Sequence, residues 1–495
     1  MAGSVKPTVV IFFNDWKVFP NGVNSGGGES ATLALARRIA GCGHRVIACA
    51  NLPAGDTTAD GIEFWSFGGD YSLHRVEKRL RDIGPYYCLC ATLAHPLLFL
   101  REHQHCLARI VINHAPSSHP SGLEPSTIGE LVDYTLCVST WQRELLEYAG
   151  ASTEKLAVVK NGFEAAQFPY AGPENRDWNQ LIFIGRLEAG KGIHVLIHAF
   201  GMLKAEFPDL KLAVYGDDTR WIEFSEKKAD YVKRFPGLVF HGKVPQSQLA
   251  AELRRAGLLV FPSISPESAG LAVVEAQASG CPVVAFNSGG VVDYLSPRVG
   301  RIISEVGAEP LRNGIARMLR DRAGLIACSR AAESTRDRTW EVVAQEVLAY
   351  CEMAATRNGG IIDAPLPESV RRVETVSGIA TETLLLDHDA LLNNEAFPEW
   401  QLERIIARGS TMAWPYLVRG LRLEKQGDLE GARCAYDEAV RRARPNDWQP
   451  FFRLAMIYAD RRDFPTASRY ARGVLERAPN FPLRAPLERL AAINP

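Results

Sequence analysis

Two acidic residues, Glu267 and Glu275, stand out in the stretch Phe261–Tyr294, whose pattern predicts a loop, a helix and a buried strand in that order. Glu267 precedes the predicted helix, and Glu275 lies roughly 7 Å along its axis. The amino end of a helix attracts phosphate through its unpaired N–H groups. Glu275 could accept hydrogen bonds from a ribose, and Glu267 could contact a group beyond the phosphates. This order suits a nucleotide sugar, although helix starts also favour acidic residues for purely structural reasons.

Two cations follow a strand-like run at 181–185. Arg186 and Lys191 flank a loop that contains glycine. In open parallel sheets, ligands bind beyond the carboxyl ends of the strands. Cations at such an edge suit a diphosphate, and a merely solvated loop is the alternative.

The first part of the chain predicts a β–turn–α–β unit. An apolar strand at 8–13 precedes a glycine turn at 25–29 and a helix that runs to Ala40. Three consecutive glycines, at 26–28, would let the backbone approach an anion closely. They do not form the G-x-G-x-x-G pattern, and no acid ends the second strand at Asn51, which disfavours a dehydrogenase. A structural glycine turn remains the alternative.

His114 follows a third apolar run, at 108–113, and therefore lies at the ligand-binding edge of the predicted sheet. A ligand role and a structural role are both open for this residue. His95 follows another apolar run and is interpreted as structural.

Composition bounds the class of protein. The chain has 495 residues, 46% of them hydrophobic, which suggests about three domains. A net charge of −1 argues against nucleic-acid binding. Ten cysteines without a C-x-x-C pair are typical of reduced thiols in a cytosolic protein. No signal peptide or membrane-spanning run is predicted, so we expect a cytoplasmic protein.

The α/β pattern restarts after a polar segment at 171–179, which is interpreted as a linker. Further strands are predicted at 211–217, 238–242 and 258–263. The predicted fold is therefore α/β, with two doubly wound, Rossmann-like halves. The glutamate pair lies in the second.

Taken together, these motifs resemble the family 4 retaining glycosyltransferases, which have the GT-B fold of two Rossmann-like domains facing across a cleft. The similarity covers about 350 residues. It is carried by GGGE at 26–29, His114, Asn161-Gly162 (interpreted as a turn), Phe168, GRLEAGKGIHVLIHAF at 185–200, FHGKV at 240–244, PESAGLAVVEAQASGCPVVA at 266–285, SGG at 288–290 and TWEVVAQEVLAYCE at 339–352.

The resemblance implies an acceptor-side domain at 1–170, a nucleotide-sugar domain at 171–337 and a closing helix back to the first domain at 338–355. The sequence beyond it predicts a linker at 356–379 and a tetratricopeptide-like helical domain at 380–495.

The resemblance also implies roles for individual residues on the donor side. Arg186 and Lys191 would neutralise the diphosphate, and Glu275 would hold the ribose. Glu267 would hold the transferred sugar together with the backbone of three neighbours. The remaining donor contacts implied are Gly27, Gly28, His241 (near the base), Ala269, Gly270 and Leu271.

For catalysis, the resemblance implies that His114 reaches a sugar hydroxyl or the reacting centre. With Glu267, Arg186 and Lys191 it forms the expected catalytic set. No metal, cofactor or general base is expected, because attack comes from the leaving-group face and the donor phosphate helps take the proton. The D-x-D match at 387–389 lies beyond the α/β halves and is interpreted as accidental.

The expected donor is UDP- or GDP-linked, and the acceptor is a saccharide, a lipid-linked group or a protein. Two departures from the family pattern, Ala269 and the run Val291-Val292-Asp293, leave the sugar open. The alternative function is a non-catalytic scaffold on a transferase fold. The enzymatic runner-up is a nucleotide-sugar-using relative with other chemistry. A phosphorylase is disfavoured, because the sequence gives no signal for the cofactor-linked lysine that it would need.

The tail changes character. Residues 361–400 carry 8 acids and 2 bases (net −6), and residues 401–495 carry 17 bases and 11 acids (net +6). A repeat with an offset of 467 − 432 = 35 residues resembles tetratricopeptide repeats, and further helices are expected from 380 to 410. We expect this module to bind a protein partner or to self-associate. The alternatives are a stabilising appendage and peripheral contact with anionic lipid on the inner face of the membrane.

Overall fold

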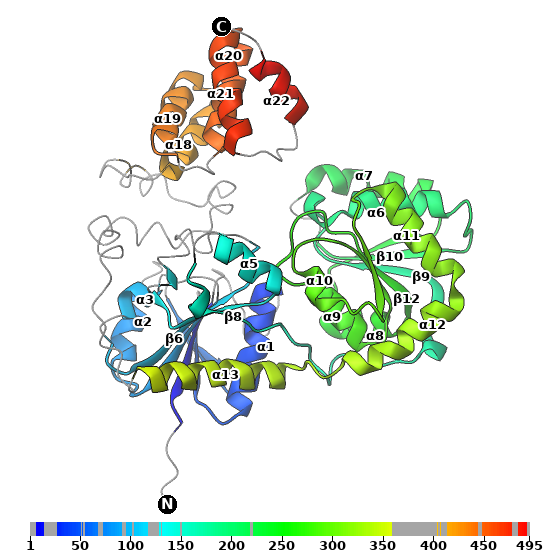
Figure 1. The fold of residues 1–495 in the computed structure, drawn as a ribbon, viewed down its shortest axis with the longest axis horizontal. Coiled ribbons are helices and arrows are strands. Elements are labelled where there is room, and N and C mark those ends of the chain that lie inside the picture. The colour runs from blue at the N-terminus through cyan, green and yellow to red at the C-terminus, as the bar shows by residue number, and fades with distance from the viewer. Residues whose placement is uncertain are drawn as a thin grey trace, which may run out of the picture. The chain divides into compact units, whose positions relative to one another are not determined.

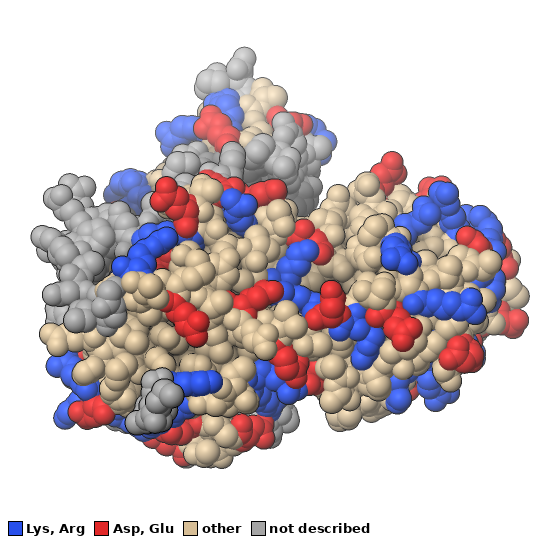
Figure 2. Space-filling model, turned by 60° about the horizontal axis from the view of Figure 1, so that its bottom comes forward, with Lys and Arg blue, Asp and Glu red and all other residues tan. Residues whose placement is uncertain are grey.

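The computed structural model describes residues 6–13, 27–50, 52, 55–67, 73–91, 96–100, 103–116, 128–129, 131–148, 151–217, 221–358, 403, 406, 413–443, 448–477 and 484–492. The chain divides into two compact units, Met1–Leu366 and Pro367–Pro495. Within the described ranges, no helix is both long and apolar enough to cross a membrane. Acidic and basic side chains are interspersed on the face in Figure 2.

The first half of the first unit is built on an eight-stranded sheet of order β3-β4-β2-β1-β5-β6-β7-β8. Its strands pair in parallel except for β3 with β4. The continuous apolar runs in the sequence become strands that are buried on both faces, as parallel sheets require. The strands are β1 (Thr8–Phe12), β2 (Val46–Ala50), β3 (Thr57–Ala59), β4 (Ile62–Ser66), β5 (Tyr86–Ala91), β6 (Cys106–Asn113), β7 (Tyr134–Cys137) and β8 (Leu156–Val158).

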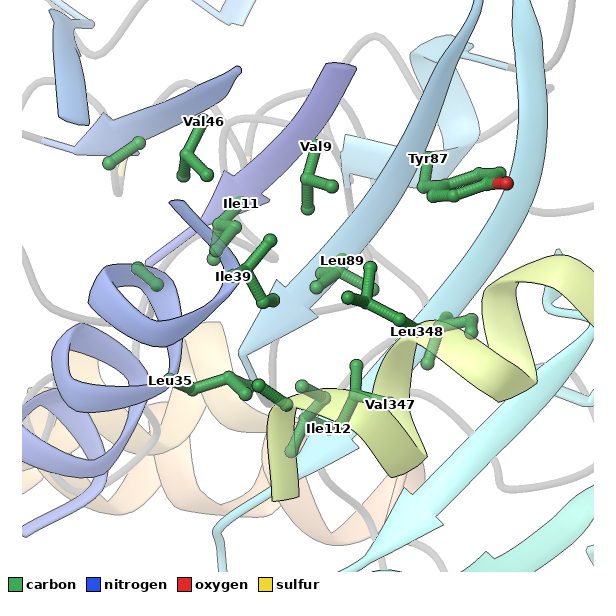
Figure 3. Close-up of a cluster of buried hydrophobic side chains, with 14 of the residues drawn as sticks. Val9, Ile11, Leu35, Ile39, Val46, Tyr87, Leu89, Ile112, Val347 and Leu348 are labelled. Atoms are coloured by element: carbon green, nitrogen blue, oxygen red, sulfur yellow. The ribbon is translucent and has the colours of Figure 1, made fainter. Parts of the chain in front are cut away.

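Two helices from opposite ends of the unit share one face of this sheet. They are α1 (Gly27–Gly41) and α13 (Trp340–Arg357), and both pack against the strands (Figure 1). Figure 3 shows Leu35 and Ile39 of α1 and Val347 and Leu348 of α13 gathered around Leu89 of β5. Each such buried side chain contributes about 1.5–3 kcal/mol. The core of the first half is therefore completed by a helix that follows the second half in sequence.

The second half is built on a six-stranded parallel sheet of order β11-β10-β9-β12-β13-β14. Buried clusters lie on both of its faces, so both faces are covered by helices (Figure 1). The strands are β9 (Asp177–Ile184), β10 (Lys211–Tyr215), β11 (Leu238–Gly242), β12 (Ala256–Phe261), β13 (Val283–Phe286) and β14 (Gly300–Ile303). The helices are α6 (Ile193–Leu203), α7 (Ile222–Arg234), α8 (Gln246–Arg255), α9 (Leu271–Ala278), α10 (Val291–Tyr294), α11 (Ala308–Arg320) and α12 (Arg322–Ala331). Two doubly wound α/β halves confirm the predicted fold class.

Two local predictions between the halves were wrong. The segment 171–179 is not a free linker, because β9 begins at Asp177 and Arg176 is buried. The Arg176 guanidinium donates to the carbonyls of Leu253 and Ala256 and to Ser329 Oγ. Burial lowers the pKa of Arg176. This polar segment therefore contains a buried arginine that links distant parts of the second half.

Asn161-Gly162 is not a turn but part of an extended crossover between the halves. The next residue, Phe163, pairs with Thr339 in the returning crossover. A Cβ on Gly162 would lie 2.7 Å from the Thr339 carbonyl carbon. Glycine is therefore required for the close approach of two backbones and not for a turn.

The second unit is helical in its described part. Its helices are α18 (Trp414–Lys425), α19 (Leu429–Arg441), α20 (Gln449–Asp460), α21 (Phe464–Arg477) and α22 (Arg484–Ala491). The 35-residue offset is visible in the backbone, since Gly427 and Arg462 both have positive φ, at 85° and 60°. One offset apart, Ala432 and Ala467 are both fully buried. The helical tail is confirmed, and its identity as tetratricopeptide repeats stays a prediction. Several expectations lie outside the described residues: the linker from 359 onward, the D-x-D match at 387–389 and His95. The same holds for the helices expected at 380–410, of which only residues 403 and 406 are described.

Candidate active site

The predicted donor residues of the second half collect at one edge of its sheet. Arg186 follows β9, Glu267 follows β12 and His241 lies at the end of β11. These strands are all parallel and β9 adjoins β12, so their carboxyl ends share an edge. The sheet thus places these side chains on the side where open α/β folds bind ligands.

A half-buried ion pair lies at this edge of the sheet. Lys191 Nζ is 2.6 Å from Glu267 Oε1, and Ser263 Oγ donates to the same oxygen over 2.5 Å. The loop that carries Lys191 is held tightly, because Gly190 O accepts hydrogen bonds from the N–H groups of Ile264 and Ser265. The Glu267 carboxylate is therefore fixed from two sides.

Glycine is essential at the end of this loop. Gly192 has a φ of 68°, and a Cβ there would lie 1.9 Å from Pro262 O. No other residue fits between the two loops. The glycines that the sequence placed around Lys191 therefore serve the contact with the Glu267 loop.

The amino end of helix α9 lies just after Glu267 in the chain. Gly270 precedes the first helical residue, and Glu275 lies one turn further along. Gln246 Nε2 at the start of α8 donates to Glu275 Oε1 over 2.9 Å. Burial raises the pKa of Glu275 to about 7, against the opposing effect of the Gln246 hydrogen bond. The carboxylate is thus oriented by a neighbour and titrates near neutral pH.

Two predicted donor residues have separate partners. Arg186 Nη2 lies 3.1 Å from Glu188 Oε1, and its side chain is 53% exposed. The His241 ring stacks on Tyr215, with centroids 4.5 Å apart and planes 7° from parallel. Burial raises the pKa of Tyr215 to about 12. The stack presents an aromatic surface at the edge of the sheet.

From the first half, His114 and Gly28 meet at the start of α1. A Cβ on Gly28 would lie 3.3 Å from His114 Cβ, and Thr32 Oγ1 is 3.4 Å from His114 Nε2. Burial lowers the pKa of His114 to about 4. The imidazole is therefore neutral at neutral pH.

The two halves meet at the α9 tip. Ser268 Oγ donates to His114 O over 2.6 Å, and a Cβ on Gly27 would lie 3.6 Å from Leu271 Cδ1. Ala269 and Leu271 pack against the core of the first half. Hence the glycines, His114 and residues 268–271 form one junction beside the Lys191–Glu267 pair.

Sequence reasoning missed the polar residues that hold the site together. Ser263 and Gln246 bond the two glutamates, Ser268 bonds His114, and Tyr215 stacks on His241. Only Ser268 carried a sequence signal, because it lies inside the motif at 266–285. Gln246 and Tyr215 have partners 29 and 26 residues away, and Ser263 lies four residues before Glu267 without forming a recognisable motif with it.

Comparisons with known proteins bear on the fold and on the class of protein. Residues 167–338 match the family described as glycosyl transferases group 1. The chain is 26% identical over 341 residues to the glycogen synthase of Mycobacterium tuberculosis H37Rv, covering 64% of this chain and 81% of that protein. It is 29% identical over 243 residues to the phosphatidyl-myo-inositol mannosyltransferase of Mycolicibacterium smegmatis, covering 48% and 59%.

Among solved structures, sucrose-phosphate synthase from Thermosynechococcus elongatus has a similar fold, with a TM-score of 0.60 at 17% identity, covering 71% of this chain and 100% of that one. HepE from Anabaena, in complex with UDP and glucose, has a TM-score of 0.56 at 16% identity, covering 70% and 100%. The match at 167–338 and the relatives support glycosyltransferase activity, and the two α/β halves have the GT-B fold of the similar solved structures.

Proposed function

We propose that the chain is a retaining glycosyltransferase of the family 4 kind, which moves a sugar from a nucleotide-diphosphate donor without a catalytic metal. The observation that carries this proposal is the Lys191–Glu267 pair beside the amino end of α9, next to the junction with His114. A cation, a helix end and a fixed carboxylate are the groups that a sugar diphosphate requires.

Each group has a part in the transfer. As the sugar leaves, negative charge grows on the diphosphate, and Lys191, Arg186 and the α9 N–H groups stabilise it. Glu275 accepts hydrogen bonds from the ribose hydroxyls. Glu267 orients the sugar while its anomeric carbon gains oxocarbenium character.

The retained configuration follows from attack on the leaving-group face. The acceptor hydroxyl approaches beside the departing phosphate, which takes its proton. His114, neutral at working pH, holds a sugar hydroxyl by a hydrogen bond and leaves the net charge of the pocket unchanged. No protein general base is assigned.

We take UDP- or GDP-linked sugars as donors and a saccharide, lipid-linked group or protein as acceptor. The relatives named for glycogen synthesis and for mannosyl transfer to phosphatidyl-myo-inositol support a saccharide or a lipid-linked acceptor, and the HepE complex makes UDP a natural first probe. We place the protein in the cytoplasm, with the helical tail available for a protein partner, self-association or the membrane surface. The family and relatives favour a transferase over the non-catalytic scaffold.

A thermal-shift screen of UDP- and GDP-sugars on the full chain tests the proposal. We expect one class to raise the Tm, and Lys191→Ala to reduce the shift at the same donor concentration. NMR of the product should then show the donor's anomeric configuration, and EDTA should leave the rate unchanged. An inverted product would overturn the retaining mechanism, and loss of activity in EDTA would overturn the metal-free one. Donor affinity left unchanged by Lys191→Ala would overturn the site.

A further inference from the structure

A short helix of the second half completes a helix of the first. Asp293 lies on α10, and its Oδ2 accepts hydrogen bonds from Thr140 N at 2.5 Å and Trp141 N at 3.3 Å. Thr140 and Trp141 are the first two residues of α5 (Thr140–Tyr148), which belongs to the first half. The partners are 153 residues apart in sequence.

The N–H groups of the first four residues of α5 all have partners. A helix leaves its first four N–H groups without internal partners. Ser139 serves the third and fourth, because its Oγ accepts from Gln142 N at 3.2 Å and its carbonyl accepts from Arg143 N at 3.1 Å. Asp293 serves the first two. The cap of α5 is therefore shared between the two halves, and it is complete only while they are in contact.

The surroundings hold α10 in this position. Lys160 Nζ donates to Asp293 O over 2.8 Å, and the Tyr294 hydroxyl donates to Val138 O and accepts from Asn161 N. A Cβ on Gly290 would lie 2.5 Å from Ser139 Oγ. The glycine turn before α10 thus comes within van der Waals reach of the α5 cap, which a larger residue would push away.

This contact leads to the active site along two routes. On the side of the first half, buried Gln142 donates through Nε2 to Ala115 O over 2.7 Å, and Ala115 follows His114. On the side of the second half, Gly290 N donates to Glu267 O over 2.7 Å. The α5 cap therefore lies between the backbone supports of His114 and Glu267.

We propose that Asp293 is a positioning residue that couples α5 to the donor loop and so fixes His114 relative to Glu267. The catalytic meaning of this coupling rests on the proposed function, whereas the coupling itself does not. Asp293 touches neither sugar nor phosphate in this scheme. It acts through α5, Gln142 and the turn at Gly290.

Hydrogen exchange measured by mass spectrometry on the full chain tests the coupling without any ligand. In Asp293→Ala we expect the α5 amides to exchange about fivefold faster, as for a lost cap. Asp293→Asn should stay close to wild type, because an asparagine oxygen also caps helices. The matched control is Asp321→Ala, since Asp321 caps α12 within the second half by accepting from Gly324 N at 2.8 Å. It should leave α5 exchange unchanged.

Kinetics with the donor found in the screen test the positioning role. Asp293→Ala should lower kcat about tenfold, because small misplacements of reacting groups are costly. Its affinity for the nucleoside diphosphate that the wild type binds, UDP or GDP, should change by less than about twofold, since the donor groups lie in the second half. Asp293→Asn should restore kcat.

Three outcomes would overturn the inference: unchanged α5 exchange in Asp293→Ala, an equal loss of kcat in Asp321→Ala, or a fall in nucleotide affinity as large as the fall in kcat. A wild type that binds no nucleotide sugar would instead refute the proposed function, and the exchange comparison would still decide whether Asp293 couples the halves.

Discussion

The two α/β halves share a fold but supply their site groups in different ways. The second half uses charged or polar side chains held in pairs, Lys191 with Glu267 and Gln246 with Glu275. The first half supplies a neutral histidine and the glycine backbone at the start of α1. In the proposed scheme, charged side chains therefore contact the donor phosphates, whereas the histidine that the first half contributes is neutral.

The hydrophobic cores of the two halves also differ in which segments build them. Both faces of the second sheet are packed by helices of the second half itself. The first half needs α13, whose Trp340, Val343 and Val347 join its core. The core of the first half is therefore complete only when α13 packs on it, whereas the second half covers its sheet with its own helices.

The largest effect that we expect concerns His114, and it tests the difference between the halves on the side of the first half. His114→Ala should lower kcat about 100-fold, as for the loss of a hydrogen bond used in the transition state, and leave nucleotide binding unchanged. Steady-state kinetics and calorimetry measure both. His44→Ala is the control, because His44 bonds Pro7 O before the start of β1. A loss of nucleotide affinity in His114→Ala would break the division between the halves.

The complementary change lies in the second half. Lys191→Ala should weaken nucleotide-sugar binding by about 2 kcal/mol, or roughly 30-fold, because it removes a cation and leaves the Glu267 carboxylate without it. Calorimetry with the screened donor measures the change. Lys211→Ala removes the exposed pair of Lys211 with Asp177 in the same sheet and should have no effect. Equal losses in both variants would indicate a general charge effect.

The raised pKa of Glu275 predicts a pH dependence confined to donor binding. The ionised carboxylate is the better acceptor for ribose, and with a pKa of about 7 its fraction rises with pH. Affinity for the donor should therefore increase about tenfold from pH 6 to pH 8. Glu275→Gln should flatten this profile. His114, with a pKa of about 4, stays neutral throughout this range and does not contribute.

The smallest effect tests the junction between the halves. Gly28→Ala should lower kcat about fivefold, because the new methyl group would crowd His114 at 3.3 Å. Gly27→Ala places its methyl 3.6 Å from Leu271, an ordinary contact, and should change kcat by less than about twofold. Comparing kcat of the two variants by steady-state kinetics would separate crowding of His114 from the general effect of an alanine at the start of α1. A larger loss of kcat in Gly27→Ala than in Gly28→Ala would show that the junction is not rigid.

Much of the fold followed from the sequence because parallel strands are local apolar runs. The runs around Val10, Val214 and Val284 became buried strands at nearly the predicted positions. Arg176 and Gly162 misled the prediction. Their polar or turn-like character is local, whereas their actual partners are backbone groups from distant segments.

The sequence by itself determined where Lys191, Glu267 and Glu275 lie, two of them in loops after parallel strands and the third on a helix, because a loop, a helix start and a strand end are encoded by neighbouring residues. Only the tertiary structure decided how these residues are supported. Ser263 fixes Glu267, Asp293 caps a helix of the other half, and α13 returns to the first core. Such contacts join residues that are far apart in the chain, or whose mutual orientation only folding fixes. Neither periodicity nor spacing along a sequence records them.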